Sequence, residues 1–140
     1  MTATAPRYVA AALVFVVGAV HFQQYIAVLS EVKTIGVLFL LNAAGGFALT
    51  VMLLWKDRTL NALGALGSIP LCLGSLVSIL LARGGGIFGY QEPDWRAAVV
   101  IAVVAEVAAL VVLTAYLARS YSGGTTGEQT STSVPQGSRT

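Results

Sequence analysis

The sequence predicts an all-α integral membrane protein, an antiparallel four-helix bundle followed by a disordered C-terminal tail. Three observations predict this class. Of the 140 residues, 56% are hydrophobic and 10% are charged, whereas ordinary soluble domains carry about 25% charged residues. Four apolar runs reach the roughly 20 residues that a helix needs to cross a bilayer. The charged residues stand almost only between these runs.

The four expected spans are residues 8–29, 35–55, 60–82 and 97–118, within a transmembrane domain of residues 1–119. Aromatic residues with a polar tip mark the borders, as expected for the two membrane–water interfaces. These are Tyr8, Trp55, Trp95 and Tyr116. Short connections after the first and second spans favour an up-down-up-down arrangement of neighbouring helices.

The first span contains the only histidine of the chain, His21. Gln24 and Tyr25 follow it at helical spacing, so the three side chains are expected to share one polar face. The apolar run continues to Leu29. A cleaved signal peptide is the alternative interpretation of this segment. The length of the apolar run favours a membrane span that is retained in the protein.

The second and third spans carry polar residues among small ones. Asn42 shares a face with two glycines of the second span, and Ser75 belongs to a stripe of Gly, Ser and Ala in the third span. Small residues let membrane helices approach closely, and serine hydroxyls can form hydrogen bonds between helices. Pro70 interrupts the hydrogen bonding of the third helix, so a kink and a cavity wall are expected there.

The fourth span contains a single ionisable residue in its apolar stretch, Glu106. A charged side chain at this depth costs a few kcal/mol on insertion scales, so such a residue is by default functional or paired. Its face of the helix carries alanines, which places Glu106 on the packing side. At 1.5 Å per residue, His21, Asn42, Ser75 and Glu106 all fall in the same half of the membrane. A polar layer contributed by all four helices is therefore expected.

The connection at residues 83–96 reads RGGGIFGYQEPDWR. Its glycines permit positive backbone angles. Ile87, Phe88 and Tyr90 are expected either to fold over the bundle as a lid or to form a surface loop. From residue 120 to residue 140 the chain is rich in Ser, Thr, Gly and Gln, which predicts a disordered polar tail.

The distribution of Lys and Arg orients the spans. With both termini in the cytoplasm, the inner side holds five basic residues and the outer side three, which agrees with the positive-inside rule. The inner residues are Arg7, Lys56, Arg58, Arg119 and Arg139, and the outer ones are Lys33, Arg83 and Arg96. The expected location is the cell membrane, and the composition favours a prokaryotic inner membrane.

Several function classes are excluded or left open. No basic patch indicates nucleic acid, and the single cysteine, Cys72, forms neither an internal disulfide nor a metal motif. No catalytic residue, metal or cofactor is expected, although the sequence does not decide whether the protein is an enzyme. The leading hypothesis is an accessory or structural subunit, or a protein that binds or transports a small molecule. The candidate ligand or proton-relay residues are His21, Gln24, Tyr25, Asn42, Ser75 and Glu106.

Two alternatives remain open beside it. One is proton-linked transport of a small solute by a His–carboxylate pair, whose proton affinity suits exchange near neutral pH. The other is a haem- or quinone-associated enzyme subunit, for which His21 would be one axial ligand. The expected partners are the lipid bilayer and either further copies of the chain or a larger membrane complex.

Overall fold

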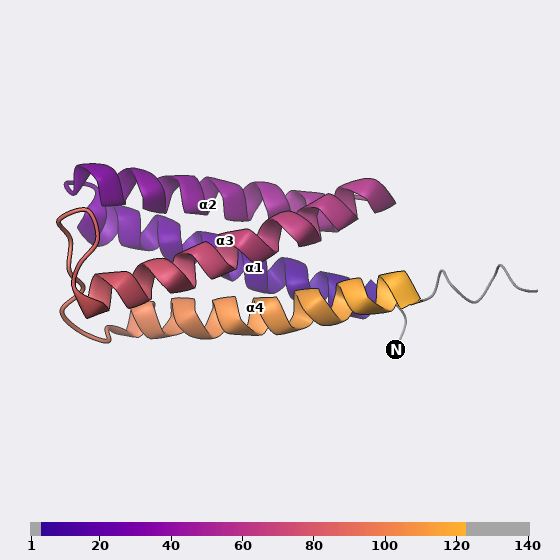
Figure 1. The fold of residues 1–140 in the computed structure, drawn as a ribbon. Coiled ribbons are helices and arrows are strands. Elements are labelled where there is room, and N and C mark those ends of the chain that lie inside the picture. The colour runs from indigo at the N-terminus through magenta and orange to yellow at the C-terminus, as the bar shows by residue number, and fades with distance from the viewer. Residues whose placement is uncertain (1–3, 123–140) are drawn as a thin grey trace, which may run out of the picture.

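The computed structural model describes residues 4–122, and within them the chain is all-helical. Four long helices lie lengthwise beside one another (Figure 1). They are α1 (Thr4–Gln24), α2 (Lys33–Leu54), α3 (Arg58–Gly84) and α4 (Ala97–Ser122), and a π-helical turn η1 (Tyr25–Leu29) extends α1. Each of the four is long and apolar enough to cross a membrane. The disordered tail was expected to begin at residue 120, but residues 120–122 are helical and belong to α4. Residues 123–140 of the expected tail lie outside the described residues.

Helix α1 packs against both α2 and α4, and α3 packs against α2 and then α4. Helix α3 runs obliquely, from the end of α2 toward the start of α4 (Figure 1). Asp57 caps the start of α3, since its carboxylate accepts a hydrogen bond of 2.9 Å from the backbone N–H of Leu60. Such an N-cap satisfies a backbone donor that the first turn leaves unpaired.

Small residues bring the helices together. A Cβ atom on Gly46 of α2 would lie 2.9 Å from the Cα atom of Gly18 in α1, so the two backbones touch at this crossing. Between α2 and α3, a Cβ on Gly64 would lie 3.0 Å from the backbone nitrogen of Leu53. The helices α2 and α3 therefore also approach closely in the first half of α3.

The buried core occupies the half of the bundle that holds the start of α1 and the end of α4. It consists mainly of small and medium side chains. They are Ala10, Ala11, Val14, Val17, Leu53, Ala65, Cys72, Ala105, Ala109 and Leu113. Cys72 is fully buried among them, as expected for a small apolar side chain.

The π-helical turn changes which residues face inward after Gln24. An α-helical continuation of the polar face would bring Val28 inward, but Val28 is 46% exposed and Leu29 is buried. Because a π turn places more residues in one turn than an α-helix does, the inward face shifts along the sequence. Tyr25 stands at the start of this turn, half-buried and near Gly36.

Candidate functional site

A cavity of about 450 Å³ lies in the other half of the bundle, beneath the α3–α4 connection. All four helices and the connection contribute to its walls, which are mostly apolar with a few polar groups. From the helices come Val20, His21, Gln24, Ile35, Leu38, Phe39, Leu41, Asn42, Pro70, Leu71, Gly74, Ser75, Ser78, Ile79, Ala82, Ala98, Val99, Ala102, Val103 and Glu106. From the connection come Ile87, Tyr90, Glu92 and Arg96.

The cavity opens sideways between α2 and α3. These helices touch near Gly45, where an added Cβ would lie 2.8 Å from Leu71, whereas a Cβ on Gly74 would meet nothing within 4 Å. Gly74 is exposed although it lines the cavity, and so are Leu38 and Leu41 on the facing helix. The two helices therefore diverge after Pro70, and the space between them reaches the outer surface of the bundle.

His21 is held in a defined orientation at the cavity wall. Its Nδ1 atom lies 2.8 Å from the carbonyl oxygen of Val17, and its Nε2 atom lies 2.9 Å from the hydroxyl oxygen of Ser75. A carbonyl oxygen can only accept, so Nδ1 carries a hydrogen. In the neutral ring, Nε2 is then an acceptor and the Ser75 hydroxyl donates to it. The contacts thereby select one tautomer.

This tautomer can be measured directly. In protein labelled with ¹⁵N at histidine, at a pH where the ring is neutral, we expect a protonated Nδ1 and an unprotonated Nε2. Because His21 is the only histidine in the sequence, both resonances belong to it, and their couplings to the Hδ2 and Hε1 hydrogens of the ring distinguish Nδ1 from Nε2. A spectrum with the hydrogen on Nε2 would contradict the orientation described above.

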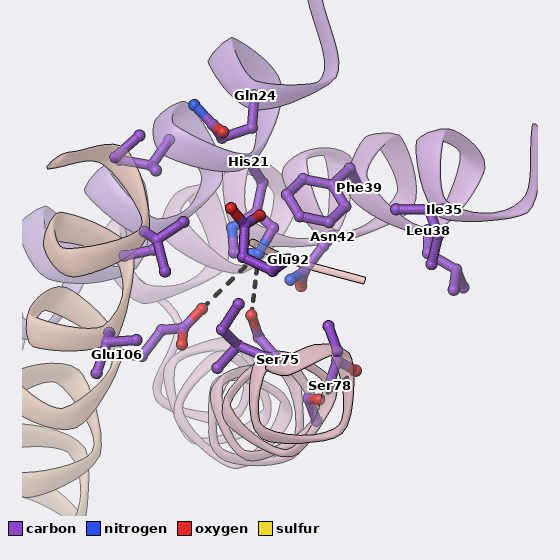
Figure 2. Close-up of a pocket in the computed structure, with 18 of the residues that line it drawn as sticks. His21, Gln24, Ile35, Leu38, Phe39, Asn42, Ser75, Ser78, Glu92 and Glu106 are labelled. Carbon is purple, nitrogen blue, oxygen red and sulfur yellow. Dashed lines mark hydrogen bonds and ion pairs between the residues drawn. The ribbon is translucent and has the colours of Figure 1, made fainter. Parts of the chain in front are cut away.

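Glu106 reaches the same point from α4. Its Oε1 atom lies 3.8 Å from Nε2 of His21, and the residue is 1% exposed. Figure 2 shows His21, Ser75 and Glu106 directed toward one another at the side of the cavity. Oε1 has no hydrogen-bond partner among the described residues. The three helices α1, α3 and α4 thus contribute to one buried polar cluster, which we call the His–Ser–Glu cluster (His21, Ser75 and Glu106).

The other candidate residues from the sequence differ in whether they line the cavity. Asn42 lines the cavity from α2 and is labelled beside Phe39 in Figure 2. Gln24 also lines it. Its Nε2 donates to Oε1 of Gln23 at 2.6 Å, and its own Oε1 is buried with no partner in the part of the chain that the structure describes. Tyr25 does not line this cavity. Its ring lies instead near Gly36 of α2.

The connection between α3 and α4 forms a tight hairpin over the cavity. Ile87 and Tyr90 exchange two backbone hydrogen bonds of 2.8 and 2.9 Å, and the residues between them, Phe88 and Gly89, both have positive φ. Two positive φ angles are the requirement of a type I′ turn. Ile87 and Tyr90 line the cavity, whereas Phe88 at the tip is 67% exposed and does not. Of the three expected lid residues, two lie over the cavity.

A partly buried ion pair anchors this hairpin. Neither of its residues, Glu92 and Arg96, was among the candidates proposed from the sequence. Oε1 and Oε2 of Glu92 accept hydrogen bonds of 2.9 and 2.7 Å from Nε and Nη2 of Arg96, and Oε2 also accepts one of 2.6 Å from the Tyr90 hydroxyl. The backbone N–H of Glu92 donates to the carbonyl of Ala82 at the end of α3. The opposite charges at positions 92 and 96, close together in the short stretch before α4, were the signal available in the sequence.

The pair sets the protonation of its members. Burial raises the pKa of Glu92, but the hydrogen bonds from Arg96 and Tyr90 outweigh it and hold that pKa below its usual range. Burial and the neighbouring carboxylate raise the pKa of Tyr90 to about 12. Glu92 is therefore an anion and Tyr90 a neutral donor at neutral pH. Their charges and hydrogen bonds are satisfied within the connection.

The structure thus has four apolar helices around a laterally open cavity. A buried polar cluster lies at the wall of this cavity. Comparison with protein families, curated proteins and solved structures found no match. Within residues 4–122, no three His, Cys, Asp or Glu side chains are grouped as a metal site would require. The cavity and its polar groups are therefore the features that indicate a function.

Proposed function

We propose that this chain is an integral membrane protein, an antiparallel four-helix bundle that binds a small amphipathic molecule in its cavity. The surface supports the membrane location, because large apolar side chains are exposed along all four helices. Examples are Phe15, Leu41, Val51, Leu73, Leu80, Val104 and Val111. An apolar surface of this extent on a soluble protein would be an aggregation liability, and in a bilayer it faces lipid.

Both termini lie on the cytoplasmic side in this proposal, so the hairpin and the cavity lie in the outer half of the membrane. Arg7, Lys56, Arg58 and Arg119 then form the more basic inner end, as the positive-inside rule requires. The exposed Trp95 and Phe88 of the connection lie at the outer interface, where aromatic rings are common.

The observation that carries the binding function is the position of the His–Ser–Glu cluster at the wall of the cavity. Polar residues that only join helices satisfy one another and face closed packing. Here Oε1 of Glu106 is buried without a hydrogen-bond partner in the described part of the chain, and it belongs to a residue that lines the cavity. Ligand sites combine mainly apolar walls with a few well-placed polar groups, which is the composition of this cavity.

Blocking the cavity tests the proposal. A Cβ on Gly74 meets nothing within 4 Å, so Gly74→Phe places an aromatic ring in the space between α2 and α3 without a backbone clash. Three probes share one phenylbutyl tail and differ in the head: 4-phenylbutylamine, 4-phenylbutanol and 5-phenylpentanoate. With the protein in lipid nanodiscs, we expect saturable binding of at least one probe, weakened by about tenfold or more in Gly74→Phe, or about 1.4 kcal/mol.

Gly84→Phe is the matched control. Gly84 ends the same helix, also has open space around it and does not line the cavity, so this variant should bind as the parent does. Protein-free nanodiscs measure partition into lipid. Absence of saturable binding for all three probes, or equal binding by the two phenylalanine variants, would overturn the proposed function and leave the cluster as a link between helices.

A further inference from the structure

Two residues that line the cavity, Gln24 and Glu106, each hold a buried hydrogen-bond acceptor that lacks a donor within the described part of the chain. Oε1 of Glu106 and Oε1 of Gln24 are both buried and unpartnered among the described residues, and the two side chains are 1% and 6% exposed. The Ser75 hydroxyl uses its hydrogen on neutral His21 and retains lone pairs. A buried acceptor without a donor is costly. The cavity is therefore suited to a ligand that donates hydrogen bonds.

The charges around the cavity favour a cation. Its lining includes the charged residues Glu92, Arg96 and Glu106, together with the titratable His21 and Tyr90, and α2 and α3 contribute no charged residue to it. Glu92 and Arg96 are 2.7 Å apart and neutralise each other. Glu106 is the remaining acid, and its Oε1 lies 3.8 Å from Nε2 of His21. A cationic head would complement Glu106 in a setting of low dielectric constant.

The remaining surface suits an apolar body attached to that head. Leu38, Leu41 and Ile79 border the opening between α2 and α3, and Phe39 lines the cavity with its ring centroid 5.0 Å from that of His21. Aromatic faces attract ammonium groups, most strongly where water is excluded. A molecule dissolved in the bilayer reaches this opening from the side, without passing the hairpin.

We propose that the cavity selects lipophilic amines, taking a protonated amino group at Glu106 and Gln24 and an apolar body between α2 and α3. This inference rests on the proposed binding function and names its ligand class. Glu106 accepts from the ammonium N–H, and the Ser75 hydroxyl offers a further acceptor. Neutral and anionic molecules of the same size lack either the charge or the donors that these atoms require.

The three phenylbutyl probes test the class, because they differ only in the head. In nanodiscs at neutral pH, we expect 4-phenylbutylamine to bind about tenfold more tightly than 4-phenylbutanol, and 5-phenylpentanoate to bind most weakly. Glu106→Gln should reduce the amine-to-alcohol affinity ratio about tenfold, to near one. Glu31→Gln removes the same charge from an exposed position outside the cavity and should keep the parent ratio.

A measurement on the unaltered protein covers the case in which Glu106→Gln does not fold. Dicyclohexylcarbodiimide modifies carboxyl groups buried in membrane proteins, and peptide mass spectrometry reports the labelling of Glu106. We expect 4-phenylbutylamine to slow this labelling and 4-phenylbutanol to slow it far less. Equal affinities, or equal protection, with binding still lost in Gly74→Phe would overturn the amine inference and leave the binding function in place. No saturable binding of any probe would overturn both.

Discussion

Gly46→Leu is expected to destabilise the bundle by about 3 kcal/mol, near the upper end of the usual cost of overpacking. A Cβ at position 46 would lie 2.9 Å from the Cα and 3.1 Å from the nitrogen of Gly18, and 3.4 Å from the carbonyl oxygen of Val14. These are backbone atoms of α1, so no side-chain rotation relieves the contact and the two helices must separate. Thermal unfolding in detergent, followed by circular dichroism, measures the loss.

The matched control is Gly74→Leu, the same chemical change inside another apolar helix. Its Cβ meets nothing within 4 Å, and replacing glycine by a good helix former stabilises a helix by up to about 1 kcal/mol. We therefore expect an unchanged or higher midpoint for this variant. If the Gly46→Leu protein unfolds at the same temperature as the parent, α1 and α2 are not in backbone contact at this crossing.

Arg96→Ala is expected to loosen the hairpin over the cavity and to lower the free energy of unfolding by about 2 to 3 kcal/mol. Removing one member of a buried pair leaves the other charge without a partner, at about 3–5 kcal/mol. The Arg96 side chain is 32% exposed, so water screens part of this cost and the smaller figure applies. Glu92, with 4% of its side chain exposed, keeps the hydrogen bond from Tyr90 and loses both from the guanidinium.

Thermal unfolding and amide hydrogen exchange at Ile87 and Tyr90 measure this effect. Both backbone N–H groups form the hairpin hydrogen bonds, so faster exchange there reports its opening. A double variant, Glu92→Gln with Arg96→Met, removes both charges together and should be more stable than Arg96→Ala. Equal stability of the single and double variants would contradict the role of an uncompensated Glu92 carboxylate.

The same pair predicts a dependence on acid pH. Because hydrogen bonds hold the pKa of Glu92 below its usual range in the folded protein, the folded state binds this proton less readily than the unfolded state. The stabilisation is then complete above the unfolded pKa, about 4.3 for glutamate, and is lost as pH falls through the folded value. Arg96→Ala should lose less stability over that acid range than the parent does.

The helices of this protein were predictable because each apolar run has the length and composition that a bilayer would require of a spanning helix. The expected first span, residues 8–29, corresponds to α1 with η1, and the expected fourth span, 97–118, lies within α4. Charged residues and polar aromatics mark the ends of all four runs. The π turn was not predictable, because hydrophobic periodicity over a few residues does not distinguish it from an α-helical turn.

The candidate residues could be proposed from chemical type and depth alone. An ionisable residue in an apolar run is conspicuous, which singled out His21 and Glu106, and the rise per residue placed both with Ser75 in one half of the membrane. Glu92 and Arg96 were not singled out, because charged residues in a connection are ordinary. Their burial follows from the way the hairpin folds back onto the end of α3, a contact between segments that periodicity does not describe.

The sequence by itself determined that the chain forms four long apolar helices and that its histidine and one buried acid lie at similar depth. Both conclusions follow from local properties, namely residue type, spacing and the rise of a helix. The tertiary structure alone decided that α2 and α3 part after Pro70 and that Oε1 of Glu106 stands beside His21 at a cavity wall. Helix rotation and crossing set those features, and they depend on the fit of side chains from all four helices.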